Sequence, residues 1–129
     1  MTGGSTPAAL LEAARDMCQR SDAATAGMWP RAAALLARQA IEGAVDLYWA
    51  TGPAPVLADC SMRTQLICLT EIAGPDLAGI VSSSWASLSS ACHVHPYELA
   101  PTGSELLGWI DAVEKFCSTA KLLPTSGSE

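Results

Sequence analysis

The stretch PRAAALLARQAIEGAVDLYWA, residues 30–50, decides the fold class of this chain. Pro30 supplies the backbone angle that suits a first helical position, and Gly52 with Pro53 makes continuation of the helix unfavourable. Apolar side chains recur at helical spacing along the stretch, at Leu36, Ala40, Ala44, Leu47 and Tyr48. We therefore expect one long amphipathic helix here.

Charged residues form a second row on the same helix. Arg38, Glu42 and Asp46 follow one another at a spacing of four residues. Such a row could form a charged site, but charges at this spacing usually lie on the face of a helix that is exposed to water. The sequence therefore favours a solvated face over a functional one.

The residues before this helix predict a shorter one. Thr6 can cap a helix through its hydroxyl group, and Pro7 is suited to the next position. The apolar residues at helical spacing are Leu10, Ala14 and Met17, which extend this helix to about Arg20. We expect the following stretch SDAATAG, residues 21–27, to be a hinge.

Two further helices are expected after residue 53. Asp59 can cap the first of them, Gly74 can end it, and Pro75 begins the next almost at once, which favours antiparallel neighbours. The expected buried positions are Met62, Leu66, Leu69 and Ala73, then Leu77, Val81, Trp85, Leu88 and Cys92. Because Pro96 disfavours helical geometry in the residue before it, the second of these helices should end at His95.

A row of serines marks one side of the helix that starts at Pro75. Ser83, Ser87 and Ser90 are spaced so that they share a face. Side chains this small allow another helix to approach closely, within the bundle or across a dimer interface. A plain solvated face is the equal alternative.

The last helix has a clear start signal. Thr102 and Glu105 have the spacing of a capping box, and Asp111 and Lys115 are spaced for an ion pair. Its expected buried positions are Leu106, Ile110, Val113, Cys117 and Ala120. We expect residues 124–129 to be disordered.

Together these helices predict the fold of the whole chain. We expect one all-α domain over 1–129, ordered over about 6–123, as a single antiparallel bundle of four to five helices.

Composition limits the function classes. Half of the 129 residues are hydrophobic, and seven Lys and Arg against thirteen Asp and Glu give a formal charge of −6. The basic residues form no run, so DNA binding is not expected, and RNA binding is not favoured.

The cysteines indicate the compartment. There are five of them, an odd number, and they lie within helical patterns, which favours a reduced cytoplasmic protein. Without a signal peptide or a long apolar segment, no membrane partner is expected.

The stretch SSACHVHPYELAPTGSEL, residues 89–106, holds the candidate chemistry, because it contains Cys92, His93 and His95. Three interpretations stay open. Cys92 and His95 could bind zinc, although no second ligand pair is present. Cys92 could be a nucleophile with a histidine base, against a buried structural thiol. His95 alone could transfer a proton or touch a phosphate, against simply capping the helix end. No metal or cofactor is expected.

The run WASLSSACHVHPYELAPTGSELLGWIDAVEKF, residues 85–116, resembles the HEPN superfamily, and RAAALLARQAIEGAV, residues 31–45, is similar to an early HEPN helix. The resemblance implies a bundle that dimerises through its motif helices. It also implies a metal-independent endoribonuclease of defence or toxin–antitoxin systems. The family motif is an arginine, four to six residues and a histidine. His95 matches the histidine, whereas Leu88, Ser89 and Ser90 occupy the arginine positions.

The missing arginine decides between the functions that the resemblance implies. An arginine would stabilise charge on the scissile phosphate, and serine cannot replace it. We therefore expect a non-catalytic interaction or dimerisation module, homodimeric, with an antitoxin or defence component as a protein partner. The alternative is a metal-independent endoribonuclease that uses His95 with His93, for which Arg38 or Arg63 would have to supply the charge. A bundle that serves only as a scaffold is the third reading.

Overall fold

The computed structural model describes residues 6–19, 29–93 and 99–121, and within them it contains helices and no strand. The elements are α1 (Pro7–Gln19), α2 (Trp29–Ala50), the 3-10 helix η1 (Pro55–Asp59), α3 (Met62–Ala73), α4 (Pro75–Ala91) and α5 (Gly103–Thr119). The all-α prediction is therefore confirmed. The expected hinge at 21–27 and the expected tail at 124–129 lie outside the described residues. None of the described helices combines the length and the hydropathy that a membrane span requires.

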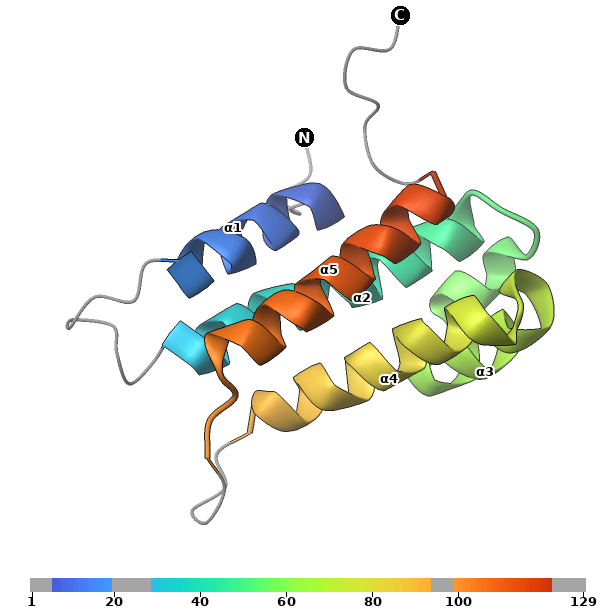
Figure 1. The fold of residues 1–129 in the computed structure, drawn as a ribbon. Coiled ribbons are helices and arrows are strands. Elements are labelled where there is room, and N and C mark those ends of the chain that lie inside the picture. The colour runs from blue at the N-terminus through green and yellow to red at the C-terminus, as the bar shows by residue number, and fades with distance from the viewer. Residues whose placement is uncertain (1–5, 20–28, 94–98, 122–129) are drawn as a thin grey trace, which may run out of the picture.

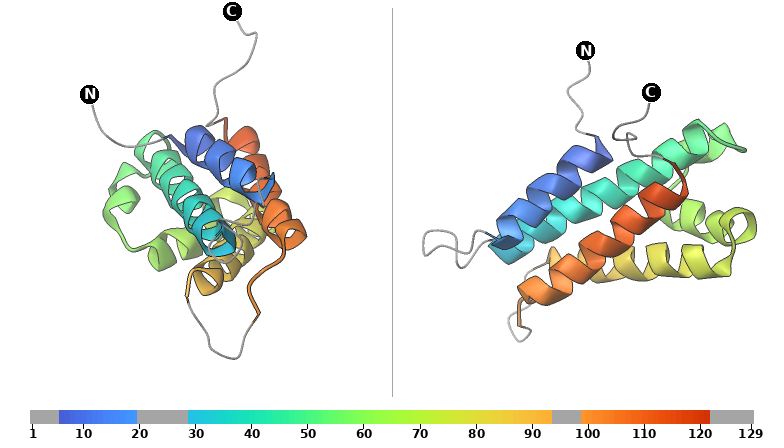
Figure 2. Two further views of the ribbon diagram at one scale, coloured as in Figure 1. Left: turned by 90° about the vertical axis from the view of Figure 1, so that its left-hand side faces the viewer. Right: turned by 45° about the horizontal axis from the view of Figure 1, so that its top comes forward.

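The helices pack as a bundle around α2. Helices α2 and α5 run in the same direction, whereas α1 and α4 run the opposite way (Figure 1). Helices α1, α4 and α5 all contact α2, and α3 packs mainly against α4 (Figure 2). The short connection at Gly74, where the backbone angle φ is +95°, turns α3 into α4 as the sequence predicted.

The core side of α2 consists mainly of alanine. Its fully buried residues are Ala33, Ala34, Ala37, Ala40, Ile41, Ala44, Val45 and Trp49. The predicted stripe was only partly right, because Leu36, Leu47 and Tyr48 are half-buried. Helices α1, α4 and α5 pack around α2, and its buried alanines allow these neighbours to approach closely. Ile41, Val45 and Trp49 are buried beside these alanines, whereas the half-buried Leu36, Leu47 and Tyr48 lie at the margins of the contacts.

Local start signals were mostly correct. Thr6 Oγ1 accepts a hydrogen bond from the Ala9 amide at 3.1 Å, and Thr102 forms a complete capping box with Glu105. The predicted cap Asp59 was wrong, because that residue ends η1 and Ser61 caps α3 instead. Pro55 starts a separate turn of 3-10 helix, which delays the beginning of α3.

Helix α4 ends earlier than expected. Its last residue is Ala91 rather than His95. The Cys92 amide donates to the carbonyl oxygens of both Leu88 and Ser89, at 3.1 and 3.3 Å, and the His93 amide donates to Ser90 at 3.2 Å. This tightening closes the helix before the influence of Pro96 is reached.

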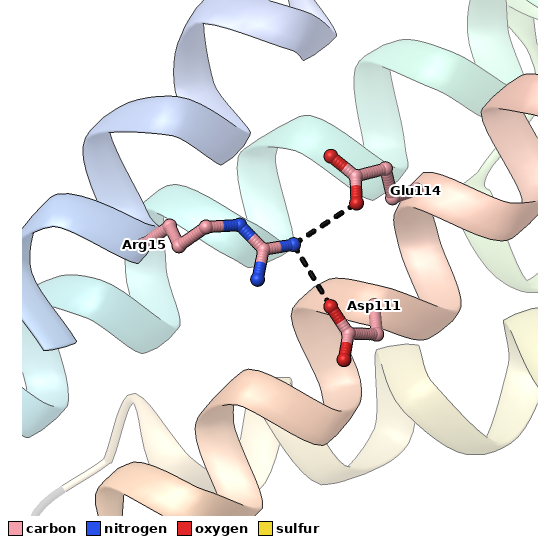
Figure 3. A network of polar contacts seen from close by, with 3 residues as sticks. All are labelled: Arg15, Asp111 and Glu114. Carbon is pink, nitrogen blue, oxygen red and sulfur yellow. Dashed lines mark hydrogen bonds and ion pairs between the residues drawn. The ribbon is translucent and has the colours of Figure 1, made fainter. Parts of the chain in front are cut away.

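Helix α1 is tied to α5 by ion pairs as well as by the core. Arg15 Nη2 lies 2.9 Å from Asp111 Oδ1 and 3.0 Å from Glu114 Oε1 (Figure 3). The predicted pair of Asp111 with Lys115 is therefore replaced by a pair between helices. Unlike Lys115 in the expected pair, Arg15 contacts two carboxylates on successive turns of α5 with one guanidinium group.

Candidate functional site

Of the stretch 89–106, the structure describes residues 89–93 and 99–106, and the side chain of His93 is exposed just beyond α4. His95, the residue that matches the HEPN motif, lies outside the described residues. Of the three positions where the motif arginine would stand, Leu88 is in the core and Ser89 has a buried hydroxyl oxygen. Only Ser90 is exposed. A long cation at the other two positions would have to displace buried atoms.

His93 lines a pocket of about 220 Å³ at one end of the bundle, which we call the His93 pocket. It lies between the start of α2, the end of α4 and the start of α5. Its polar or aromatic lining residues are Arg31, Ser87, Ser90, His93, Glu105 and Trp109. Two of the three serines singled out from the sequence thus face a pocket, while Ser83 is exposed. The positive charge of Arg31 is opposed by Glu105 in the same lining.

Arg31 was missed from the sequence. It lies in the first turn of α2, 62 positions before His93, and it reaches the His93 pocket because α2 and α4 are antiparallel neighbours. The antiparallel order of these helices was the available signal, since it brings the start of one helix to the end of the other. Sequence reasoning named Arg38 and Arg63 instead.

Arg38 and Glu42 of α2 form a polar cluster with Trp85 of α4. Arg38 Nε lies 3.1 Å from Glu42 Oε2, and the same oxygen accepts a hydrogen bond from Trp85 Nε1 at 2.9 Å. The pKa of Arg38 is raised, above all by its hydrogen bond to Glu42, and the nearby thiol of Cys92 adds to this effect. The expected solvated face is therefore only partly right, because α4 partly covers Arg38 and Glu42 whereas Asp46 is exposed.

The ion pair between Arg38 and Glu42 limits what Arg38 can do in a reaction. Both partners of the Arg38–Glu42 pair are only about one-third exposed, at 31% each. The carboxylate compensates the guanidinium charge, so Arg38 is poorly suited to stabilise a phosphate, although it lies beside Cys92. Asp46, the third residue of the row, accepts a hydrogen bond from the buried Gln65 at 2.9 Å.

A third feature is an open apolar groove of about 280 Å³ between α3 and α4, which we call the α3–α4 groove. It is lined by Arg63, Leu66, Ile67, Thr70, Ser82, Trp85 and Ala86. Ile67 at its edge is 66% exposed. A signal for this site existed in the sequence, because Ile67 is a large apolar residue outside the predicted buried stripe of its helix.

The cysteines were also candidates for a metal site. Within the part of the chain that the structure describes, no group of three or more histidine, cysteine, aspartate or glutamate side chains is placed to hold an ion. Cys92 is half-buried and packs against the core, and its pairing with His95 in a zinc site lies beyond the described residues. Burial raises the pKa of the Cys117 thiol to about 11, with a smaller contribution from the charge of Glu114.

The raised pKa of Cys117 predicts a loss of stability in alkali. Between pH 9 and about 11 the unfolded thiol ionises while the native thiol keeps its proton, so unfolding becomes easier as pH rises. We expect the wild type to lose about 2 kcal/mol of stability relative to Cys117→Ala over this pH range. Urea unfolding under reducing conditions measures this difference. A difference that stays constant would contradict the assignment.

Comparisons of the chain with protein-family models, with curated proteins and with solved structures give no match. The HEPN resemblance accordingly rests on the motif residues alone. The choice among functions depends on the three features described above: the His93 pocket, the Arg38–Glu42 cluster and the α3–α4 groove.

Proposed function

We propose that this chain is a non-catalytic, HEPN-like interaction module that binds a protein partner through the α3–α4 groove. The observation that carries the proposal is the exposure of Ile67, 66%, at the edge of an apolar groove that also contains Leu66 and Trp85. Large apolar side chains that line a surface groove are typical of protein interaction sites.

The charges near the end of α4 support a non-catalytic role. Arg38 is compensated by Glu42, and Arg31 shares its pocket with Glu105. The whole chain carries a formal charge of −6, so its overall field opposes the approach of a polyanion. Both conditions disfavour the charge stabilisation that phosphodiester cleavage requires.

The biological setting of this proposal comes from the HEPN resemblance alone. It implies a defence or toxin–antitoxin system, in which an antitoxin, another defence component or a second copy of the chain would be the protein partner. The groove itself indicates the chemistry of that partner. It must present apolar side chains to Ile67 and Trp85, and Arg63 at the rim favours a nearby carboxylate.

Site-specific photo-crosslinking tests the proposal. A photoreactive amino acid replaces Ile67 in the full chain, produced in its native cells, and adducts are identified by mass spectrometry. We expect one discrete protein adduct from position 67. The exposed position 12 on α1 is the matched control and should give none. The absence of a specific adduct at position 67 would overturn the proposal.

The second candidate is a metal-independent endoribonuclease, which one observation favours. Arg31 and His93 line the same pocket, so a guanidinium group from α2 shares this pocket with one of the two histidines. In this alternative, His95 or His93 transfers the proton. Cleavage of a mixed RNA pool in EDTA, lost in both Arg31→Ala and His95→Ala, would establish the enzyme. If folded wild-type protein leaves the RNA intact, the interaction module stands.

A further inference from the structure

We propose that the protein partner of the α3–α4 groove is a second copy of this chain, with the two α3 helices antiparallel and in contact at Ile67. This inference rests on the proposed function, because it names the occupant of the same groove. Its central contact is between the two α3 helices, whereas the HEPN resemblance implies a dimer through the motif helix α4.

The pattern of exposed residues on α3 is the first argument. Arg63, Ile67 and Glu71 are exposed and follow one another at a spacing of four residues. Residues at this spacing lie on the same side of a helix, about 6 Å apart along its axis. Arg63 and Ile67 also line the groove, so this side of α3 continues into the apolar surface.

The order of the charges is the second argument. A two-fold axis through Ile67 reverses the direction of the helix, so Arg63 of one copy lies opposite Glu71 of the other. The same contact occurs twice because of the symmetry. Within the described residues, neither Arg63 nor Glu71 has an ion-pair partner in its own chain. The surface is therefore complementary to itself in charge.

The position of α3 leaves room for this contact. Figure 2 shows α3 at the outer edge of the bundle, and it contacts α2, η1 and α4 but neither α1 nor α5. The neighbouring surface of α4 carries Ser82 and Ala86, whose small side chains allow Ile67 of the second copy to approach Trp85. The interface thus combines an apolar centre with charged ends.

The size of the interface sets the expected strength of association. Helix α3 has 12 residues, which gives a length of about 18 Å at the usual rise per residue. One short helix pair with a small groove falls below the roughly 800 Å² per subunit of stable complexes. We therefore expect a dimer that dissociates on dilution, rather than a permanent one.

Exchange of the two charges tests the proposed geometry. Sedimentation equilibrium of the full chain should show concentration-dependent dimers for the wild type. Arg63→Glu and Glu71→Arg should each raise the dissociation constant by about tenfold or more, because each creates two like-charge contacts. The double variant Arg63→Glu/Glu71→Arg restores opposite charges across the axis and should regain dimerisation.

Controls separate this geometry from general charge effects. Lys115→Glu and Glu12→Arg make the same changes of charge at exposed positions on α5 and α1, and they should leave dimerisation unchanged. Circular dichroism verifies that each variant keeps its helices. A double variant that stays monomeric overturns the antiparallel contact, and so does an equal effect of the control variants.

The outcome also distinguishes this inference from the proposed function. If the wild type is a monomer at all concentrations but position 67 cross-links to a different protein, the second copy is wrong and the interaction module remains. If the wild type is a monomer and position 67 gives no specific adduct, both are wrong. Adducts between two copies at position 67, together with rescue by the double variant, support both.

Discussion

Replacing Phe116 with alanine is expected to lower the free energy of unfolding by about 3–5 kcal/mol, the largest effect of any single change that we predict. Phe116 is fully buried, at 0% exposure, on the side of α5 that faces the core. Its ring lies 6.0 Å from the ring of Tyr48 on α2, measured between centroids. Removal of the ring leaves a cavity between two long helices that cannot easily close.

Chemical denaturation with the circular dichroism signal at 222 nm measures this effect. Domains of this size have total stabilities of about 5–15 kcal/mol, so Phe116→Ala should shift the midpoint strongly. Leu99→Ala is the control, since Leu99 is 97% exposed, and it should change stability by less than about 0.5 kcal/mol. Phe116→Leu retains much of the volume and should cost less than the alanine variant. Equal effects of the two Phe116 variants would contradict the cavity argument.

The parts of the fold that depend on neighbours in sequence could be predicted. The caps at Thr6 and Thr102 and the turn at Gly74 rely on contacts within four residues, and all three are confirmed. The buried stripe of α5 was also largely correct, because α5 has one core-facing side and its apolar residues follow it. These features depend on local chemistry and not on which helices pack against one another.

The parts that depend on packing could not be predicted in the same way. Helices α1, α4 and α5 pack around α2, so its alanines are buried and its row of Arg38, Glu42 and Asp46 is partly covered. A charged row at helical spacing looks the same in sequence whether water or another helix faces it. The approach of Arg31 to His93 likewise depends on which helix ends meet, and spacing along the chain does not contain this information.

Near η1, the wrong prediction of a helix cap at Asp59 left a tertiary contact of Gln65 unpredicted. Asp59 was expected to cap α3, but it ends η1, and Gln65 in the first turn of α3 reaches α2 through a hydrogen bond to Asp46. Gln65 is only 2% exposed although it is polar. Its Nε2 atom donates to Asp46 Oδ1 at 2.9 Å and to the Cys60 carbonyl oxygen at 2.8 Å. This one amide therefore joins α2, α3 and the end of η1.

We accordingly expect Gln65→Ala to lower the free energy of unfolding by about 2–4 kcal/mol, through the loss of these hydrogen bonds and of buried volume. Gln39→Ala makes the same change at an exposed position of α2 and should have an effect of less than about 0.5 kcal/mol. Gln65→Leu fills the volume without forming the hydrogen bonds. The stability that this variant loses therefore measures the polar contribution.

Hydrogen exchange should show the Cys60 region opening more often in both Gln65 variants. If exchange there is unchanged while stability falls, Gln65 contributes to packing only, and it does not hold η1 and α3 against α2.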